Sequence, residues 1–223
     1  MGERMDGAAA GDIWVEAWLA IWIRPRATMR RIVAADPRKF VLGIAFVAGA
    51  LAALGMRVNM AVAPIAPAHM PMRMPHLGPF GVAIAALLTG GFSVAMLYAF
   101  GALYRWSGAI LGGTADAISV RAALAWSRVP SIFITIVDIF AAAIWMPSAS
   151  SMRHPTLSPF GLIGLVGGIW SFVISLKCLG EVHGFSAWRA LGAILLGFLA
   201  IIVVSVAVAI TIWLAVVVGR ALA

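Results

Sequence analysis

Methionine and histidine side chains gather in two segments that lie between long apolar stretches of the chain. The set consists of His69, Met70, Met72, Met74, His76, Met152 and His154. Thioether sulfur is a soft ligand that suits reduced copper, and imidazole binds copper in either oxidation state. The spacing therefore supports a hypothesis of copper capture. The alternative is that methionine serves here as a flexible apolar side chain, with no cofactor bound.

An acidic residue, Asp138, lies inside an apolar stretch that we predict to cross a membrane. Trp145 follows near the end of that stretch, which places the carboxyl group about 10 Å below the nearer interface. An intramembrane carboxylate is costly and normally faces the bundle interior beside a partner. Lys177 lies near the opposite end of its own span, so the expected partners are Arg57, Arg73, Arg153, His154 or His76. Two interpretations stay open: a paired or protonated packing residue, and a residue that handles protons or cations.

A basic residue, Arg128, lies near the other end of the same stretch, next to Pro130. We interpret it as a structural clamp that reaches Glu181 or Asp116 at that interface. The only group with acid–base potential nearby is the segment from Glu181 to Gly184. The chain shows no nucleophile elbow, phosphate-binding loop, close carboxylate pair or zinc spacing. We therefore expect no enzymatic activity.

The elements that carry these residues are set by the composition of the chain. Apolar residues make up 63% of its 223 residues and charged residues 11%, so lipid must be the solvent of most of the chain. A span needs roughly 20 apolar residues, and five segments meet or approach that length: residues 40–56, 80–104, 122–145, 157–180 and 190–219. We predict an all-α membrane protein with a five-span bundle over residues 40–220, preceded by a cytoplasmic or interfacial segment over residues 1–39. The single cysteine, Cys178, excludes an internal disulfide and is expected to be a packing residue.

The basic residues predict the orientation of these spans, because cytoplasmic ends carry an excess of arginine and lysine. One side receives Arg4, Arg24, Arg26, Arg30, Arg31, Arg38, Lys39, Arg105, Arg121, Arg128, Lys177 and Arg189. The opposite side keeps Arg57, Arg73, Arg153 and Arg220. We predict a cytoplasmic N-terminus and a periplasmic C-terminus in a bacterial inner membrane, with no cleaved signal peptide. The net charge is +8, but the basic residues flank the spans and form no long basic tract. This distribution argues against nucleic acid as a partner.

The N-terminal segment has the pattern of an interfacial helix pair. Trp14, Trp18 and Trp22 recur every four residues and form one stripe of a short helix that ends at Pro25. A second amphipathic stretch carries the basic residues Arg26, Arg30 and Arg31. Such a pair would lie in the headgroup layer, where each basic residue attracts anionic lipid by about 1 kcal/mol. The equal alternative is that both helices pack beneath the bundle.

Two segments repeat the pattern M-R-x-P-x-L-x-P-F-G, at residues 72–81 and 152–161. Each copy leads into a long apolar run, which indicates duplicated helical hairpins. Pro79 and Pro159 suit the first turn of a helix, where a missing N–H costs nothing. Glycines follow in both runs, and small residues on one stripe allow close helix approach. We therefore expect the second and fourth spans to be equivalent members of a repeat.

Three motifs give the chain a resemblance to a known family. They are Ile23-Arg24-Pro25-x-x-x-Met29-x-x-Ile32 followed by Asp36-Pro37, the turn Leu111-Gly112-Gly113-Thr114-Ala115, and Arg128-Val129-Pro130. Together they resemble the amphipathic lead-in, the GG turn and the proline-bearing third span of bacterial members of the Yip (Ypt-interacting protein) domain family, over roughly residues 14–220. The resemblance implies five spans and a cytoplasmic N-terminus. Eukaryotic members act in vesicle trafficking and bind Rab-type GTPases, but their acidic D-L-Y-G-P-type element is absent here, which argues against a GTPase partner.

The sequence favours a non-enzymatic membrane scaffold or accessory subunit that binds anionic lipid and protein partners, either other membrane proteins or a second copy. The alternative is a small transporter or copper-handling protein in which the methionine and histidine segments capture a soft cation and Asp138 lies on its path. Transport requires a polar path that continues below Asp138, whereas a scaffold requires only a sealed, glycine-packed bundle.

Overall fold

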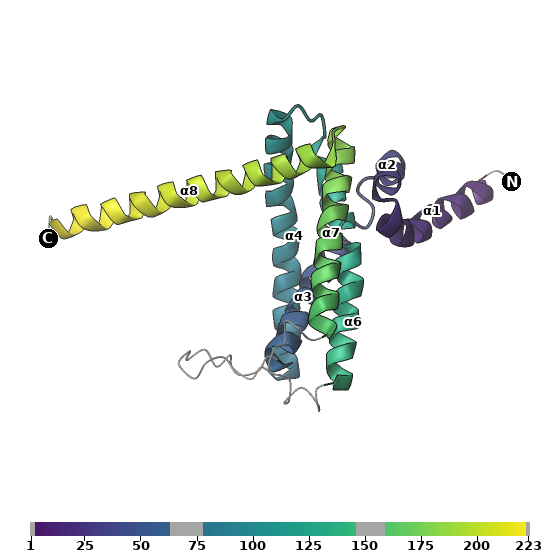
Figure 1. Cartoon of the computed structure of the whole chain (residues 1–223), viewed down its shortest axis with the longest axis horizontal. Coiled ribbons are helices and arrows are strands. Elements are labelled where there is room, and N and C mark those ends of the chain that lie inside the picture. The colour runs from purple at the N-terminus through teal and green to yellow at the C-terminus, as the bar shows by residue number, and fades with distance from the viewer. Residues whose placement is uncertain (1–2, 63–77, 146–158, 222–223) are drawn as a thin grey trace.

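The computed structural model describes residues 3–62, 78–145 and 159–221 of the chain, and these residues contain helices and no strands. In chain order the helices are α1 (Glu3–Ile23), α2 (Pro25–Ala35), α3 (Val41–Val62), α4 (Pro79–Ile110), α5 (Ala117–Trp126), α6 (Val129–Trp145), α7 (Pro159–His183) and α8 (Ala187–Ala221). Figure 1 shows α4, α6 and α7 standing side by side, with α1 and α2 at one end of this group.

Among the described residues, four helical segments are long and apolar enough to cross a membrane, which indicates an integral membrane protein. They are Pro79–Ile110, Ala117–Ala141, Leu162–His183 and Ala187–Arg220. The first of the five predicted spans falls on α3, whose apolar part, Val41–Met56, is shorter than a full span. Arg57 ends that apolar run, and roughly 20 residues are needed to cross the hydrocarbon. The helical membrane fold is therefore confirmed, but the count of five spans is not.

The third predicted span is interrupted between α5 and α6. Pro130 is the second residue of α6, and it has no N–H to bond back to the preceding turn, where its ring also crowds a carbonyl. The chain bridges the break with a turn in which the Arg128 N–H donates to the Ala125 carbonyl at 3.0 Å. The Ser127 hydroxyl donates to the Leu124 carbonyl at 3.2 Å. The local effect of the proline is thus a short turn that separates two helices within one span.

The two predicted hairpins pack through single glycines. α4 and α7 begin at Pro79 and Pro159, as the repeated pattern predicts. A Cβ atom at Gly90 of α4 would lie 2.7 Å from the Phe46 ring of α3, and one at Gly167 of α7 would collide with Ile134 of α6. α3 thus approaches α4 closely, and α6 approaches α7 in the same way. In both hairpins a glycine of the second helix admits a large side chain of the first.

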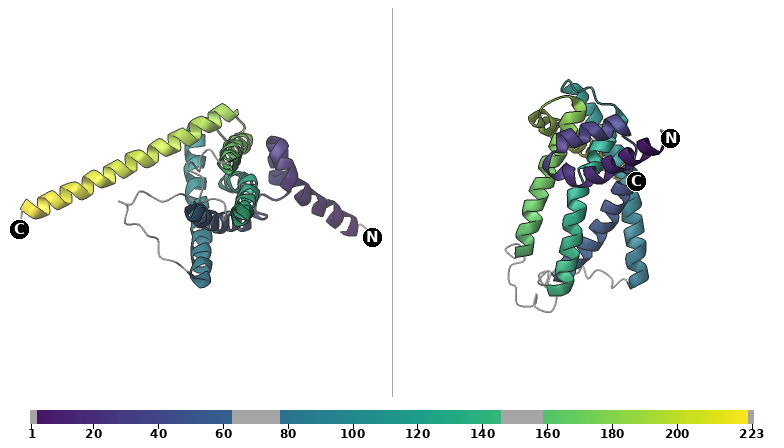
Figure 2. Two further views of the ribbon diagram at one scale, coloured as in Figure 1. Left: turned by 60° about the horizontal axis from the view of Figure 1, so that its bottom comes forward. Right: turned by 90° about the vertical axis from the view of Figure 1, so that its right-hand side faces the viewer.

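One end of the bundle is formed by α1, α2, α5 and the C-terminal ends of α4 and α7; the right view of Figure 2 shows α1 and α2 crossing the upper part of the upright helices. We call it the basic end. Its basic residues are Arg24, Arg26, Arg30, Arg31, Arg38, Lys39, Arg105, Arg121, Arg128, Lys177 and Arg189. Apart from Arg4, whose side chain lies outside the description, the residues that the charge pattern assigned to one side therefore lie on the elements of one end.

Helix α8 starts at the basic end and then leaves the bundle. Its first turns pack on α4, where a Cβ atom at Gly197 would lie 3.1 Å from the Tyr104 ring and one at Gly192 would lie 3.3 Å from Leu111. Residues 201–220 are all exposed. Figure 1 shows α8 crossing α4 and α7 at a large angle and extending away from them to the C-terminus. This part of α8 is apolar around its whole circumference, so no single face directs it against the bundle. The predicted packing of a fifth span over residues 190–219 is therefore not observed for its second half.

Candidate functional site

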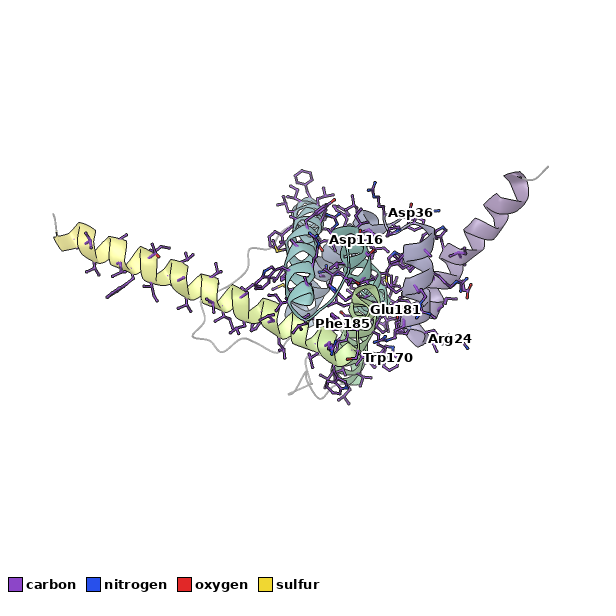
Figure 3. All side chains as sticks on the ribbon, turned by 90° about the horizontal axis from the view of Figure 1, so that it is seen from above. Arg24, Asp36, Asp116, Trp170, Glu181 and Phe185 are labelled. Carbon is purple, nitrogen blue, oxygen red and sulfur yellow. The ribbon has the colours of Figure 1, made fainter. Side chains whose placement is uncertain are left out.

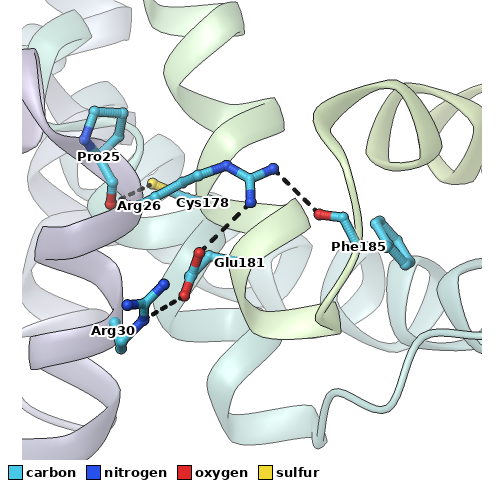
Figure 4. Close-up of polar contacts among 6 residues, drawn as sticks. All are labelled: Pro25, Arg26, Arg30, Cys178, Glu181 and Phe185. Carbon is cyan, nitrogen blue, oxygen red and sulfur yellow. Dashed lines mark hydrogen bonds and ion pairs between the residues drawn. The ribbon is translucent and has the colours of Figure 1, made fainter.

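The basic end is held together by a carboxylate of α7 that receives two arginines of α2. Arg30 Nε donates to Glu181 Oε1 at 2.7 Å, and Arg26 Nη1 lies 3.6 Å from Glu181 Oε2. Arg26 Nη2 also donates to the Phe185 carbonyl oxygen at 3.2 Å. Figure 4 shows these contacts joining α2 to the end of α7 and to the turn that follows, and Figure 3 places Glu181 and Phe185 near the middle of this end. The Glu181 side chain is only 13% exposed, and removal of either arginine would leave a largely buried carboxylate with fewer partners.

A second ion pair joins α1 to α2. Arg31 donates to both carboxylate oxygens of Glu16, each at 2.7 Å. The hydrogen bond from Arg31 holds the pKa of Glu16 below its ordinary value. This two-pronged geometry orients both groups, although each lies in solvent and the pair alone contributes little stability.

Aromatic rings provide the apolar contact between α1 and the bundle. Trp126 of α5 is fully buried; its ring centroid lies 6.1 Å from that of Trp14 and 5.4 Å from that of Trp18. Phe40, which has a left-handed backbone conformation with φ of 62°, places its ring 5.8 Å from Trp14. Trp22 contacts Phe133 of α6 at 6.0 Å. The tryptophan stripe of α1 therefore packs against the bundle, which is the second of the two alternatives that its spacing allowed.

The opposite side of α1 carries a second apolar stripe that the sequence interpretation missed. Val15, Leu19 and Ile23 are 70%, 69% and 80% exposed. We call these three residues the outer stripe. Their spacing of four was visible in the sequence, but the tryptophans on the other face gave the stronger signal. The tryptophan stripe is at least partly covered by protein, whereas the outer stripe has no such cover among the described residues and is free to contact lipid or another protein.

The predicted lipid-facing arginines of α2 are engaged by carboxylates of the same chain. Arg26 and Arg30 contact Glu181, and Arg31 contacts Glu16. Lipid contact by these arginines and by Trp14, Trp18 and Trp22 stays a prediction. The ring contacts and the paired carboxylates show that these residues hold α1 and α2 in place.

Arg128 clamps two helices, but not through the predicted partners. Its Nη1 donates to Ser93 Oγ of α4 at 2.8 Å. Glu181 is bound to α2, and Asp116 accepts the N–H of Ser119 at 3.0 Å as the cap of α5. Hydrogen bonds from Ser119, first from its side chain and then from its N–H, hold the pKa of Asp116 below its ordinary value. The expectation that Arg128 reaches Glu181 or Asp116 is wrong, because both carboxylates have nearer donors.

Asp138 faces α7 at a point where a glycine makes room for it. A Cβ atom at Gly164 would lie 3.9 Å from Asp138 Oδ2, and Oδ1 is buried without a hydrogen-bond partner in the part of the chain that the structure describes. The side chains of the expected partners Arg57, Arg73, Arg153, His154 and His76 lie outside the described residues. Pairing of this carboxylate therefore stays a prediction.

The candidate copper ligands His69, Met70, Met72, Met74, His76, Met152 and His154 also lie outside the described residues. Within residues 3–62, 78–145 and 159–221, no group of three or more histidine, cysteine or acidic side chains has the arrangement of a metal site. The copper hypothesis thus stays a prediction based on the sequence.

His183, at the end of α7, occupies a cradle made by two glycines. A Cβ atom at Gly108 or Gly113 would collide with its imidazole ring, which stacks on Phe185 with centroids 5.0 Å apart. The ring is enclosed, and among the described residues neither ring nitrogen has a hydrogen-bond partner. Thr114 donates its N–H to the His183 carbonyl at 3.3 Å. The GG turn therefore has a packing role: Gly112 supplies a positive φ of 82°, and Gly113 leaves space for the imidazole.

Comparison with known proteins gives one match. The sequence model of the Yip1 domain family matches residues 19–210, a range that includes the lead-in to α2, the GG turn and the break at Pro130. No curated protein and no solved structure matches the chain. Because the matched region covers most of the chain, from the end of α1 into α8, this protein belongs to the Yip1 domain family.

Proposed function

We propose that this protein is a non-enzymatic membrane scaffold or accessory subunit whose α1–α2 pair binds a protein partner at the surface of the bilayer. The observation that carries the proposal is the difference between the two faces of α1. One face is fixed to the bundle by Trp14 and Trp18, while the outer stripe (Val15, Leu19 and Ile23) remains exposed. An apolar stripe on a helix held by ion pairs and rings is a typical docking surface.

The contacts between α6 and α7, on the side of Asp138 that faces the basic end, support a scaffold and not a transporter. One turn further toward the basic end, Ile134 of α6 fills the space that Gly167 leaves on α7. Ile132 and Ile174 are buried below this contact. The hollow that Ile134 and Gly167 line is made of apolar side chains, so this contact offers no polar route for a cation and a role in transport gains no support from the described helices.

The charge distribution supports the proposed setting. Basic residues gather at one end of the bundle, which we assign to the cytoplasmic side of a bacterial inner membrane, with the N-terminus inside and the C-terminus in the periplasm. The expected partners are anionic lipid and another membrane protein or a second copy of this chain, and neither nucleic acid nor a resident cofactor.

Site-specific photo-crosslinking in native membranes, followed by purification in mild detergent, tests the proposal. A photoreactive amino acid at Leu19 should give one discrete cross-linked species, and the same species should co-purify with the unmodified protein. The double variant Leu19→Asp/Ile23→Asp should lose it, since two carboxylates on the outer stripe oppose apolar docking.

The matched control is Ala34, an exposed position on α2 that lies off the outer stripe. Crosslinking from Ala34 should give no such species, and the variant Ala34→Asp should retain the partner. A protein that always emerges alone, or an identical crosslinking pattern from both positions, would contradict the proposal.

A further inference from the structure

A groove at the basic end runs along α4, past the start of α5. Its larger part, of about 510 Å³, is lined by residues that include Arg105, Trp106 and Thr114. Its smaller part, of about 300 Å³, includes Arg38, Leu42 and Ile118. Tyr98 and Arg121 line both parts, so the two parts adjoin at these side chains. We call it the Arg121 groove.

Arg121 is held in one position before any ligand arrives. Its aliphatic stem crosses Gly101 of α4, where an added Cβ atom would lie 2.7 Å from Arg121 Cγ. Its guanidinium carbon lies 4.6 Å from the centroid of the Tyr98 ring, a distance at which a cation is attracted to the face of the ring. A guanidinium that is already ordered loses less entropy when it binds an anion.

The arginines of this groove differ from those of α2 in their partners. Among the described residues, ion pairs join Arg26, Arg30 and Arg31 to carboxylates, and none involves Arg105 or Arg121. The carboxylates nearest in sequence bond to backbone groups of their own turns: Asp116 accepts from the Ser119 N–H, and Asp36 from the Arg38 N–H. The groove therefore keeps positive charge that no described side chain neutralises.

The depth of the groove matches the headgroup layer of a bilayer. α4 has 32 residues and is about 48 Å long at 1.5 Å per residue, whereas the hydrocarbon core is about 30 Å thick. A start near Pro79 places Tyr98 where the hydrocarbon ends, so Arg105 and Trp106 lie among the headgroups. Trp106 is half exposed, as expected of a ring at this interface.

An exposed track leads from the hydrocarbon into the groove along one face of α4. It consists of Ile84, Leu88, Gly91, Ala95, Tyr98, Ala102 and Arg105, all exposed and spaced by three or four residues. The small residues in its middle leave room against the helix, and a Cβ atom at Gly91 would meet nothing within 4 Å. An acyl chain of a lipid can lie on this track while the headgroup of the same lipid reaches the arginines. A free inorganic anion has no acyl chain and therefore gains nothing from the track.

We propose that the Arg121 groove binds an anionic phospholipid. Arg121 and Arg105 donate hydrogen bonds to the oxygens of its phosphate, Trp106 lies beside the headgroup, and one acyl chain follows the exposed track of α4. The inference rests on the proposed function only in that the basic end must face a leaflet with acidic lipid, and it does not require a protein partner.

Native mass spectrometry of the purified protein in detergent tests this inference, with phosphatidylglycerol and phosphatidylcholine as the two lipid probes. Phosphatidylglycerol should bind more tightly, and Arg121→Gln should weaken it about tenfold, the effect of losing one charge-assisted hydrogen bond. Tyr98→Leu keeps the charge of Arg121 but removes the ring that orders it, and should weaken binding by a smaller factor. Tyr98 is half exposed, so this variant should fold.

The matched control is Arg189→Gln, which removes the same charge from an exposed residue at the same end but outside the groove. Equal losses from Arg121→Gln and Arg189→Gln would overturn the proposal, as would equal affinity for the two lipids. Competition by inorganic phosphate at concentrations comparable to the lipid would show a simple anion site and would also overturn it. If the unaltered protein binds phosphatidylglycerol as expected but gives no cross-linked partner from Leu19, the result counts against the scaffold function alone.

Discussion

Replacing Trp126 with alanine should weaken the contact between α1 and the bundle, so that α1 opens more often. Trp126 is fully buried between Trp14 and Trp18 of α1 and Phe40. Truncation of a buried aromatic residue typically costs about 3–5 kcal/mol of overall stability. The part that concerns α1 comes from two ring pairs, each contributing about 0.5–1.5 kcal/mol beyond the area they bury.

These two pairs set the expected size of the local effect. Together they amount to about 1–3 kcal/mol, and 1.36 kcal/mol is a factor of ten in an equilibrium constant. Opening of α1 should therefore become about 5- to 150-fold more frequent in Trp126→Ala. Trp126→Phe keeps a ring, and among the described residues the indole Nε1 has no hydrogen-bond partner to lose, so its effect should be only a few-fold.

Amide hydrogen exchange of residues 13–23, measured in lipid nanodiscs at constant pH, reports this opening. Trp188→Ala is the control, because Trp188 lies at the same end but is 81% exposed, and it should leave exchange in α1 unchanged. Equal exchange rates in Trp126→Ala and the unaltered protein would refute the reasoning. In that case lipid, and not the aromatic cluster, would hold α1 in place.

Three further predictions address the glycines, the ion pair of α1 and the copper hypothesis. Gly167→Ala should destabilise the bundle by about 1–3 kcal/mol because its methyl group collides with Ile134, whereas Gly168→Ala, next to it but facing open space, should be neutral or stabilising; thermal unfolding in detergent compares the two. The pKa of Glu16 lies below its ordinary value of 4.5, so the contribution of its ion pair is present above that pH and is lost as the pH falls through the lowered pKa; near-ultraviolet circular dichroism of the tryptophans should show a transition in that acidic range, and Glu16→Gln should remove it. Titration with reduced copper should show binding that disappears when the methionines and histidines of residues 69–76 are replaced together, and binding no greater than in that variant would end the copper hypothesis.

Local features of the fold could be predicted from the sequence because their causes are local. Pro79 and Pro159 begin helices, and Pro130 interrupts one, through the ring and the missing N–H of proline itself. The length of apolar runs likewise predicted most of the membrane-spanning helices. The shortfall at α3 has a similarly local cause, since Arg57 follows the apolar run of Val41–Met56.

Partners of individual side chains could not be predicted in the same way. A stripe of tryptophans looks the same whether lipid or protein covers it, so the spacing of Trp14 and Trp18 left both alternatives open. Arg128 binds Ser93 because the helices that meet there bring that hydroxyl nearer than any carboxylate. The sequence also did not predict the Arg121 groove, because its walls come from the turn before α3, from α3, α4 and α5, and no single motif contains them.

The sequence by itself determined that this chain is helical, lies in a membrane, carries its positive charge toward one end and belongs to the Yip1 domain family. The family follows from the match over residues 19–210; the other properties follow from composition, apolar run length and charge pattern, which can be read without knowing which helices meet. Only the tertiary structure decided which glycines pack, which arginines are neutralised and which face of α1 stays exposed. Those outcomes depend on distances between helices far apart in the chain, and such distances are fixed when the surfaces of the helices meet.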